Sequence, residues 1–395
     1  MVRQVLSSIF LLVCFNFVLG QKTTFKTGKP TDRTYYTQIA YENIGGKLIV
    51  PVVINDKMYK FLFDTGAPNL ISTAIASDIV LKDSKSISVS DANQKKQLMN
   101  LATIPFLTIG NVTFKNTSAL VFMDTNNLVF DCYEVDGIIG SNLLRKSIVQ
   151  IRPKERIIIL TNDRKKIEID TNKGVDLMLR GNQSSPYISI KLKSKKSAKE
   201  DVLIDTGASG FYDMCKANYR VLERHEVLQP VASGLGTSSI GLFGNSDQDT
   251  QYQVKIPEIE IDGHTFKNIA TITSGDDNSR LGSDIFEYGD LTLDFIRKRV
   301  YFHPFASESN LMERHLGLTP TIENNKLVVG MIWDDSLLET VNLGDEIVKV
   351  NAIDVTQLNI CKLLTEHSPF KTSEILDITL INKSGNTYSL TLKKY

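Results

Sequence analysis

Residues 59–70 read YKFLFDTGAPNL, and this stretch decides how the rest of the chain is interpreted. An apolar strand runs directly into Asp64-Thr65-Gly66. On its own, such a triplet is typical of a turn that ends a buried strand. A second copy occurs in 202-VLIDTGASG-210. Each copy follows a pair of alternating apolar and polar segments, which predicts a β-hairpin before each triplet.

Further internal repeats occur in the same order in the two halves of the chain. The segment 141–160 aligns without a gap with 283–302, at an offset of 283 − 141 = 142. The two triplets are offset by 205 − 64 = 141. The shorter matches are 104-IPFLTI-109 with 256-IPEIEI-261, and 109-IGNVTFKN-116 with 261-IDGHTFKN-268. Repeats in register predict two duplicated units built mostly of short strands.

The bulk composition is that of a globular protein with more than one domain. The chain has 395 residues, of which 42% are hydrophobic and 23% charged, and its length favours two or three domains. The 45 basic and 45 acidic residues cancel. A neutral chain gives no support to binding of nucleic acid or an anionic membrane, since these functions usually require a basic surplus.

The N-terminus carries the pattern of a secretory signal. Residues 1–20 combine an early Arg3 with an apolar run that is too short to span a bilayer and ends in small or apolar residues. We expect cleavage before Gln21 and export to the periplasm or the medium; the alternative is a retained N-terminal anchor. Residues 21–44 are expected to be an N-terminal leader. Its segment 21–38 is polar without clear periodicity, so this segment is expected to be disordered.

The cysteines predict neither a disulfide framework nor a zinc site. After removal of the signal, Cys132, Cys215 and Cys361 remain, an odd number at wide spacing. The five histidines are scattered, and no C-x-x-C motif occurs. We therefore expect no metal and no cofactor.

The repeated triplets and the segments after them resemble a known family. Each half of residues 45–305 is similar to a retropepsin-type aspartic protease unit, with two apolar residues before Asp-Thr-Gly-Ala and a later apolar-apolar-Gly segment before a helix. That later segment reads 136-DGIIGSNLL-144 in the first half. In the second half it reads 279-SRLGSDIF-286, where Arg280 replaces the first apolar residue.

The resemblance implies a mainly β, bilobal protein similar to a fused dimer of retropepsins. Lobe 1 would span residues 45–172 and lobe 2 residues 173–305, with Asp64 and Asp205 facing each other across a cleft. Two carboxyls at close range cannot both ionise cheaply, so they would share one proton and activate a water molecule. Thr65 and Thr206 would bond across the interface, and Gly66 and Gly207 would allow tight turns.

The family also implies a flap over the cleft. In the first lobe the flap tip would lie near residues 91–96, and in the second within residues 233–247. Gly241 and Phe243 are the flap residues proposed in the second lobe, where four glycines would give mobility. A phosphate-binding loop is excluded here because no Lys-Ser/Thr pair and no helix pattern follow the glycines.

The C-terminal part of the chain has a different pattern. Residues 306–315 are expected to be a linker, and residues 316–395 resemble a bacterial-type α+β PDZ domain through 316-LGL-318 and 344-GDEIVKVNAIDV-355. The resemblance implies that Leu316, Gly317 and Leu318 present N–H groups to a peptide carboxylate, and that a helix near residues 357–367 borders the groove. The alternative is a packing module whose groove is covered.

These observations together predict an exported, monomeric aspartic endopeptidase that acts on peptides or proteins. Asp64 and Asp205 would carry catalysis within one chain, with one active site per monomer. Two alternatives stay open at this point. One is a peptide-binding protein without hydrolytic activity, and the other is a processing protease with few natural substrates.

Overall fold

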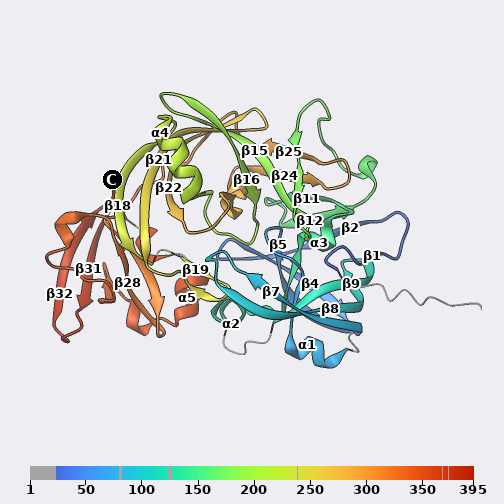
Figure 1. The fold of residues 1–395 in the computed structure, drawn as a ribbon, viewed down its shortest axis with the longest axis horizontal. Helices are drawn as coiled ribbons and strands as arrows, with labels where there is room; N and C mark the ends of the chain where they lie inside the picture. The colour runs from blue at the N-terminus through green and yellow to red at the C-terminus, as the bar shows by residue number, and fades with distance from the viewer. Residues whose placement is uncertain (1–23, 80–81, 123–126, 238, 367, 372) are drawn as a thin grey trace, which may run out of the picture.

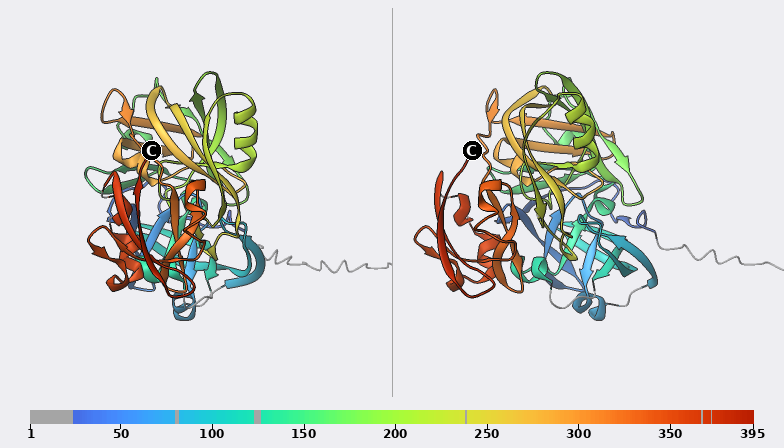
Figure 2. Two further views of the ribbon diagram at one scale, coloured as in Figure 1. Left: turned by 90° about the vertical axis from the view of Figure 1, so that its left-hand side faces the viewer. Right: turned by 60° about the vertical axis from the view of Figure 1, so that its left-hand side comes forward.

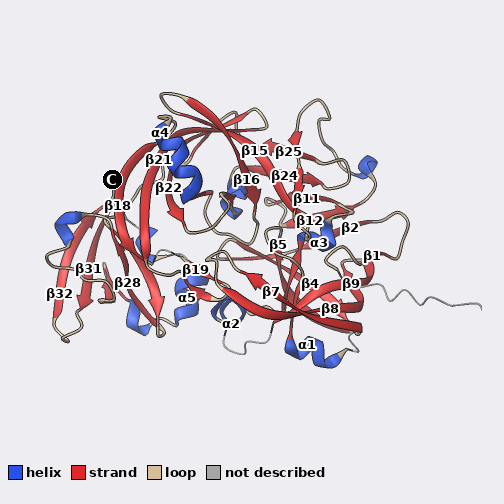
Figure 3. Cartoon of the chain, in the orientation of Figure 1, coloured by secondary structure: helices blue, strands red, loops and turns tan. Residues whose placement is uncertain are grey.

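The structure is a computed structural model that describes residues 24–79, 82–122, 127–237, 239–366, 368–371 and 373–395. Strands dominate these residues (Figure 3), so the prediction of a mainly β protein is confirmed. The proposed signal, residues 1–20, lies outside the described residues. Among the helices of the described part, none has both the length and the apolar character needed to cross a membrane.

A nine-stranded sheet in the described residues includes the strand that ends at Asp64 of the first triplet, and it lies in the blue and cyan part of Figure 1. Its β4–β5 hairpin turns at Asn55 and Asp56. Their positive φ angles of 51° and 59° are typical of the two-residue turn that joins the strands of a tight hairpin. The strands are β1 (Lys29–Pro30), β3 (Glu42–Ile44), β4 (Lys47–Ile54), β5 (Lys57–Asp64), β6 (Leu70–Ser72), β7 (Lys82–Ser90), β8 (Lys96–Ile109), β9 (Val112–Phe122) and β10 (Gly137–Gly140).

A six-stranded sheet takes strands from both halves of the chain, in the order β13-β25-β24-β11-β12-β2. Its two central strands are antiparallel and place Gln150 opposite Thr292, at a sequence offset of 292 − 150 = 142. The Gln150 side chain donates a hydrogen bond of 3.0 Å to the Thr292 hydroxyl. The strands are β2 (Tyr36–Ala40), β11 (Ile148–Arg152), β12 (Ile157–Thr161), β13 (Val175–Asp176), β24 (Gly289–Asp294) and β25 (Arg299–Pro304).

A third sheet, with fifteen strands in the described residues, runs from the second triplet into the C-terminal region. The two parts are joined where β18 pairs with β28. The strands are β14 (Met178–Arg180), β15 (Ser185–Lys193), β16 (Ser197–Ile204), β17 (Tyr212–Cys215), β18 (Gln229–Gly236), β21 (Asp249–Ile261), β22 (His264–Ser274), β23 (Arg280–Leu281), β26 (Ser309–Asn310), β27 (Leu318–Glu323), β28 (Lys326–Ile332), β29 (Glu346–Val350), β30 (Ile353–Asp354), β31 (Ile375–Ile381) and β32 (Thr387–Lys393). A two-stranded hairpin is formed by β19 (Ile240–Gly241) and β20 (Gly244–Asn245).

The helices are short and lie at the ends of strands. The α-helices are α1 (Thr73–Asp78), α2 (Leu128–Tyr133), α3 (Ser141–Leu144), α4 (Lys216–Arg224) and α5 (Ile360–Thr365). The 3₁₀ helices are η1 (Arg164–Lys166), η2 (Ser283–Glu287), η3 (Asp335–Leu337), η4 (Val355–Gln357) and η5 (Pro369–Lys371). The α3 and η2 helices follow the two apolar-Gly segments, and α5 lies within the helical segment predicted near residues 357–367.

One hydrophobic core is shared by the two halves that precede the C-terminal region. It extends in sequence from Tyr35 to Phe302 and includes buried side chains from all three large sheets. The C-terminal region has a separate core, which runs from Leu318 to Leu392. In Figure 2 this region, in orange and red, forms a distinct body beside the rest of the molecule.

The leader, residues 21–44, is ordered in its described part, so the expectation that residues 21–38 are disordered is wrong there. From Thr24 onward this segment contributes β1, β2 and β3 to two sheets. The Arg145 guanidinium donates hydrogen bonds to the carbonyls of Lys26 and Thr27, at 2.6 and 3.0 Å. Ile39 is buried in the shared core. Backbone pairing therefore orders a segment whose own composition gave little sign of structure.

The sequence predicts no disulfide framework, but the structure contains a disulfide bond. Cys132 in α2 and Cys361 in α5 are bonded to each other across 229 residues of sequence. Cys215 is buried and stays unbonded. Because the partners lie on elements brought together only by tertiary packing, their spacing in the sequence carried no signal. The bond fastens the C-terminal region to the nine-stranded sheet domain.

The segment expected to be a linker, residues 306–315, is packed into the fold. Ser309 of β26 pairs with Phe266 of β22. His315 is buried and exchanges two backbone hydrogen bonds with Tyr395, at 2.9 and 3.0 Å. The end of the chain is thus bound to the segment that enters the C-terminal region.

Candidate active site

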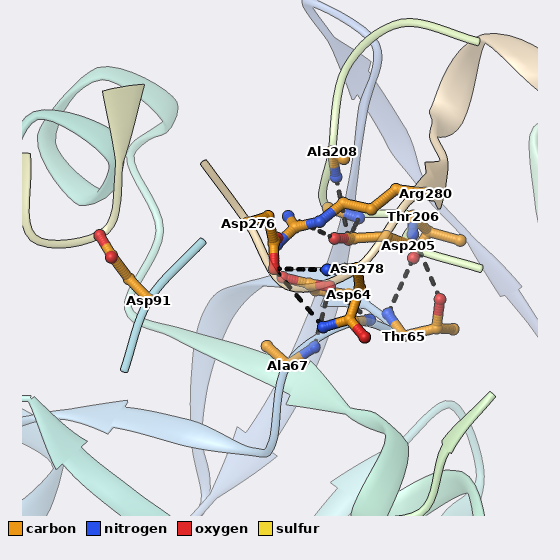
Figure 4. A network of polar contacts seen from close by, with 12 residues as sticks. Asp64, Thr65, Ala67, Asp91, Asp205, Thr206, Ala208, Asp276, Asn278 and Arg280 are labelled. Carbon is orange, nitrogen blue, oxygen red and sulfur yellow. Dashed lines mark hydrogen bonds and ion pairs between the residues drawn. The ribbon is translucent and has the colours of Figure 1, made fainter. Parts of the chain in front are cut away.

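The two Asp-Thr-Gly triplets meet between the first and third sheets, at the ends of equivalent strands. Asp64 is the last residue of β5, which pairs in parallel with β10. Asp205 follows β16 directly, and its N–H donates to the Leu281 carbonyl at 2.9 Å. The Asp64 carboxyl lies beside Gly207 of the opposite loop, and the Asp205 carboxyl lies beside Gly66. Figure 4 shows the two side chains converging from opposite loops, so the structure brings the two predicted carboxyls together.

Each loop holds its own carboxyl in the same way. The Oδ1 atom of Asp64 accepts hydrogen bonds from the N–H groups of Gly66 and Ala67, at 2.8 and 3.2 Å. The Oδ1 atom of Asp205 accepts from the two corresponding N–H groups, those of Gly207 and Ala208, at 3.1 and 3.0 Å. One oxygen of each carboxyl is thereby fixed by the backbone, which orients the other oxygen.

The two threonines lock the loops together by reciprocal hydrogen bonds. The Thr206 hydroxyl donates to the Phe63 carbonyl at 2.8 Å and accepts from the Thr65 N–H at 3.0 Å. The Thr65 hydroxyl donates to the Ile204 carbonyl at 2.6 Å and accepts from the Thr206 N–H at 3.2 Å. Both threonines are almost completely buried. The arrangement agrees with the contact that the resemblance implied for these residues.

The two glycines are required by close approach. A Cβ atom at Gly66 would overlap with the Asp205 carboxyl, and one at Gly207 would overlap with the Asp64 carboxyl. Neither glycine has a positive φ angle. The absence of a side chain at each glycine therefore leaves room for the carboxyl of the opposite loop. The sequence analysis had instead predicted that these glycines allow tight turns.

An arginine lies against the carboxyl pair, at a position where the family pattern has an apolar residue. Arg280 Nη1 is 2.9 Å from Asp205 Oδ2, and Nη2 forms an ion pair with Asp276. In the strand pairing of β17 with β23, Asp213 stands directly opposite Arg280. Burial raises the pKa of Asp213 to about 6, against the opposing effect of Arg280. The signal in the sequence was a charged residue at an apolar position of a buried strand.

A second cation near the pair, Lys47, was not predicted from the sequence, because it is the first residue of a strand with an alternating apolar and polar pattern. Lys47 in β4 is buried, and its Nζ atom donates to the Gly207 carbonyl and, at 2.8 Å, to the Ser209 hydroxyl. Burial lowers the pKa of Lys47, while Asp205 and Asp64 oppose this effect. Lys47 thus supports the second loop from the first sheet.

The environment of Asp64 favours its protonated form. Burial first, and the charge and hydrogen bond of Asp205 next, raise the pKa of Asp64 to about 7. A neutral carboxyl beside a second carboxyl can donate a proton in one step and accept it back in another. The pair is therefore equipped for general acid and base catalysis near neutral pH.

The carboxyl pair opens into a cavity of about 780 Å³. Apart from the pair and Arg280, its walls include residues from each part of the chain, among them Ile138 from the first sheet, Tyr187 from the third sheet and Leu364 from α5. A cavity of this size accommodates an extended peptide segment or a similar ligand. Within the described residues, no three His, Cys, Asp or Glu side chains are grouped as metal ligands.

The predicted flap residues border this cavity and contact each other. Residues 91–95 form the turn between β7 and β8, and the β19–β20 hairpin lies against it. Asp91 Oδ2 accepts a hydrogen bond of 2.9 Å from the Phe243 N–H. Asn93 donates to the Gly244 carbonyl at 3.0 Å. A Cβ atom at Gly241 would overlap with Asp91. The assignment of Gly241 and Phe243 to a flap stays a prediction.

Two of the four glycines expected to give this hairpin mobility have another role. A Cβ atom at Gly234 would overlap with the Ile332 carbonyl, and one at Gly236 would overlap with the Gly330 carbonyl. The Thr237 N–H also donates to the Gly330 carbonyl at 2.8 Å. These glycines permit β18 to approach β28 of the C-terminal region, so they anchor the base of the hairpin.

The three residues predicted to bind a peptide carboxylate lie where the C-terminal region begins. Leu318 starts β27 and is paired with Ile332. The Gly317 carbonyl accepts from the Trp333 N–H at 2.8 Å, and the Leu316 carbonyl accepts from the Gln253 side chain at 3.1 Å. The role of Leu316, Gly317 and Leu318 in carboxylate binding stays a prediction.

Comparison with known families places the first triplet in an aspartyl protease domain. Residues 50–143 match the family model described as aspartyl protease. The matched segment contains Asp64, Thr65 and Gly66 and ends in α3. No curated protein matches the chain. Residues 50–143 therefore form an aspartyl protease domain of the retropepsin-like type, and this match suggests peptide hydrolysis.

Proposed function

We propose that the protein is an aspartic endopeptidase in which Asp64 and Asp205 form one catalytic pair within a single chain. The observation that carries this proposal is the reciprocal bonding of Thr65 and Thr206, which holds two carboxyls in contact at the wall of a large cavity. The aspartyl protease domain at residues 50–143 supplies the first half of the pair. A rigid, partly desolvated pair of carboxyls is the arrangement that this reaction requires.

We further propose that residues 45–172 and 173–305 are duplicated lobes of one fold. Two features support this. The β5–β10 pairing places Phe63 beside Ile139, as the β16–β23 pairing places Ile204 beside Leu281. From one edge of the six-stranded sheet, the strands occur in the order β2, β12 and β11. From the other edge, the corresponding strands of the second half occur in the order β13, β25 and β24. An approximate two-fold axis between Asp64 and Asp205 accounts for both features.

In the first step of the proposed reaction, a water molecule between the two carboxyls attacks the carbon of the peptide carbonyl. Asp205, as carboxylate, takes a proton from the water while the oxygen of that water bonds to the carbonyl carbon. Asp64, as neutral acid, gives its proton to the carbonyl oxygen as the C=O double bond becomes single. The product is a neutral tetrahedral diol, and the proton has moved from Asp64 to Asp205.

In the second step the diol collapses and the C–N bond breaks. The proton now on Asp205 passes to the departing amide nitrogen, and one diol hydroxyl returns its proton to Asp64. The carboxylic acid product and the amine product then leave, and the pair regains its initial state. Gly66 and Gly207 keep the space above each carboxyl free for the opposite one throughout.

For the C-terminal region we propose a PDZ domain, residues 316–395, that presents substrate tails to the cavity or controls access to it. The position of Leu364 supports this, because α5 belongs to the C-terminal region and lines the same cavity as the carboxyl pair. Export to the periplasm or the medium is part of the proposal. It is supported by the apolar pattern of residues 1–20 and agrees with the Cys132–Cys361 disulfide, since disulfides persist in oxidising compartments.

The proposal is tested by incubating a diverse peptide library with the protein and with its Asp64→Asn and Asp205→Asn variants. Asp277→Asn is the matched control, because Asp277 lines the same cavity but is exposed to solvent. We expect cleavage by the wild type and by Asp277→Asn, and at least a 10³-fold loss in kcat for each of the other two variants, as for removal of a general acid or base.

The main alternative is a peptide-binding protein without hydrolytic activity. It predicts that the library is bound but not cleaved by the wild type, and that binding survives both Asp→Asn changes. A processing protease with few substrates predicts no cleavage of the library but cleavage of one or a few exported proteins, which is lost in the same two variants.

A further inference from the structure

The two halves of the carboxyl pair differ at one equivalent position. Ile138 in β10 pairs with Leu62, two residues before Asp64. Arg280 in β23 pairs with Leu203, two residues before Asp205. The offset of 280 − 138 = 142 is that of the surrounding repeat. One carboxyl therefore has an aliphatic neighbour at this position, whereas the other has a guanidinium.

The guanidinium is held in place rather than extended into solvent. The Arg280 side chain is 17% exposed, and its two ion-pair partners, Asp205 and Asp276, are 7% and 5% exposed. The bond to Asp205 is made to Oδ2, whereas Oδ1 is already occupied by backbone N–H groups. Ion pairs with little solvent around them are stronger and less screened than surface pairs.

Other charged groups near Arg280 do not replace it. Asp213 faces it from β17, and Asp276 binds it from the loop before β23, so neither group supplies a positive charge. Lys47 lies nearby on β4, but its Nζ atom is bound to the Gly207 carbonyl and the Ser209 hydroxyl. Among the described residues, the ion pair to the Asp205 carboxyl comes from Arg280.

We propose that Arg280 is a positioning residue that fixes the negative charge of the pair on Asp205 and leaves the shared proton on Asp64. This inference rests on the proposed function, because it assigns the base and the acid of that reaction. Without Arg280 the two carboxyls would share the proton nearly equally, as equivalent loops predict. With it, Asp205 accepts the proton of the attacking water and Asp64 protonates the carbonyl oxygen.

The environment of Asp64 agrees with this assignment. Burial, together with the charge of Asp205, raises the pKa of Asp64 to about 7. Its aliphatic neighbour Ile138 is 4% exposed and offers no charge to stabilise a carboxylate. The arrangement with the lowest electrostatic energy therefore has the proton on Asp64 and the negative charge on Asp205, beside the guanidinium.

The experiment compares Arg280→Lys, Arg280→Ile and Arg280→Met in two assays, peptide cleavage over pH 3–9 and ¹³C NMR of labelled aspartate carboxyls. Lys keeps the charge, Ile is the residue of the equivalent position, and Met fills the space of the arginine stem if Ile prevents folding. Arg299→Ile is the control, because Arg299 forms an ion pair on another sheet.

We expect Arg280→Lys to keep the wild-type pH profile. In Arg280→Ile and Arg280→Met, we expect kcat to fall at least 10-fold with KM changed less than 3-fold, and the acid limb of the profile to move up by about one pH unit, because a cation that favours the ionised pair is lost. In the NMR spectra, one carboxyl titrates near neutral pH in the wild type, whereas both share this titration in the uncharged variants.

An unchanged pH profile together with one titrating carboxyl in Arg280→Ile or Arg280→Met would overturn the assignment. So would a titration near neutral pH that belongs to Asp205 in the wild type. If the wild type cleaves no peptide, the proposed function fails, but the NMR titration still decides where the proton and the charge reside.

Discussion

The reciprocal threonine bonds are the feature on which the geometry of the carboxyl pair depends, and Thr206→Val tests them. Valine has nearly the same shape as threonine but can neither donate nor accept. The change removes the bonds to the Phe63 carbonyl and the Thr65 N–H. Both groups lie at residues that are at most 1% exposed, so water does not replace the lost partner.

The magnitude follows from leaving two buried backbone groups unpaired. Each unpaired group costs about 1–3 kcal/mol, so the free energy of unfolding should fall by about 2–6 kcal/mol. The kcat value should fall as well, because the Asp64 and Asp205 loops are no longer held in register. A misplacement of the reacting groups by about 1 Å can cost about 100-fold in rate.

The assay is urea unfolding followed by circular dichroism, together with peptide cleavage. Thr206→Ser is the first control, since it keeps the hydroxyl and should lose much less than the valine variant. Thr108→Val is the second, because the Thr108 hydroxyl is bonded to Thr113 at a half-buried site that water can reach. A Thr206→Val protein no less stable than Thr108→Val, with unchanged kcat, would refute the reasoning.

Three further predictions follow from the site and its attachments. Cleavage should decline as the pH rises through about 7, because Asp64 then loses the proton that the carbonyl oxygen requires; a rate that stays constant to pH 9 would contradict this. Replacing Cys132 and Cys361 together by Ser should lower the stability by up to about 5 kcal/mol, the chain-entropy value for a loop of this length, as measured by urea unfolding. Asp91→Ala removes the acceptor of the Phe243 N–H and should therefore alter closure over the cavity. We expect this change to raise KM or kcat. Steady-state kinetics identical to those of the wild type would count against a flap here.

Much of the site could be predicted because it is encoded locally and encoded twice. The strand, the triplet and the later apolar-Gly segment are short patterns, and their repetition in register indicated that Asp64 and Asp205 belong together. The pattern also predicted tight turns at Gly66 and Gly207, whereas the structure shows that these glycines make room for the opposite carboxyl.

Other features depend on contacts between distant segments, which no local pattern reports. The Cys132–Cys361 bond and the ordered strand β2 arise only when remote elements pack together. Arg280 was visible as an irregularity in a buried strand, yet its partner Asp205 lies 75 residues earlier in the chain. The cleft wall formed by Leu364 likewise required the placement of α5.

The central claim is that one chain contributes both carboxyls of one peptidase site. The measurement that tests it most directly is peptide cleavage by the wild type, by Asp64→Asn, by Asp205→Asn and by an equimolar mixture of the two variants. We predict activity that is first order in wild-type monomer, and no activity in either variant or in their mixture. Activity restored by mixing, or retained in either single variant, would contradict the claim.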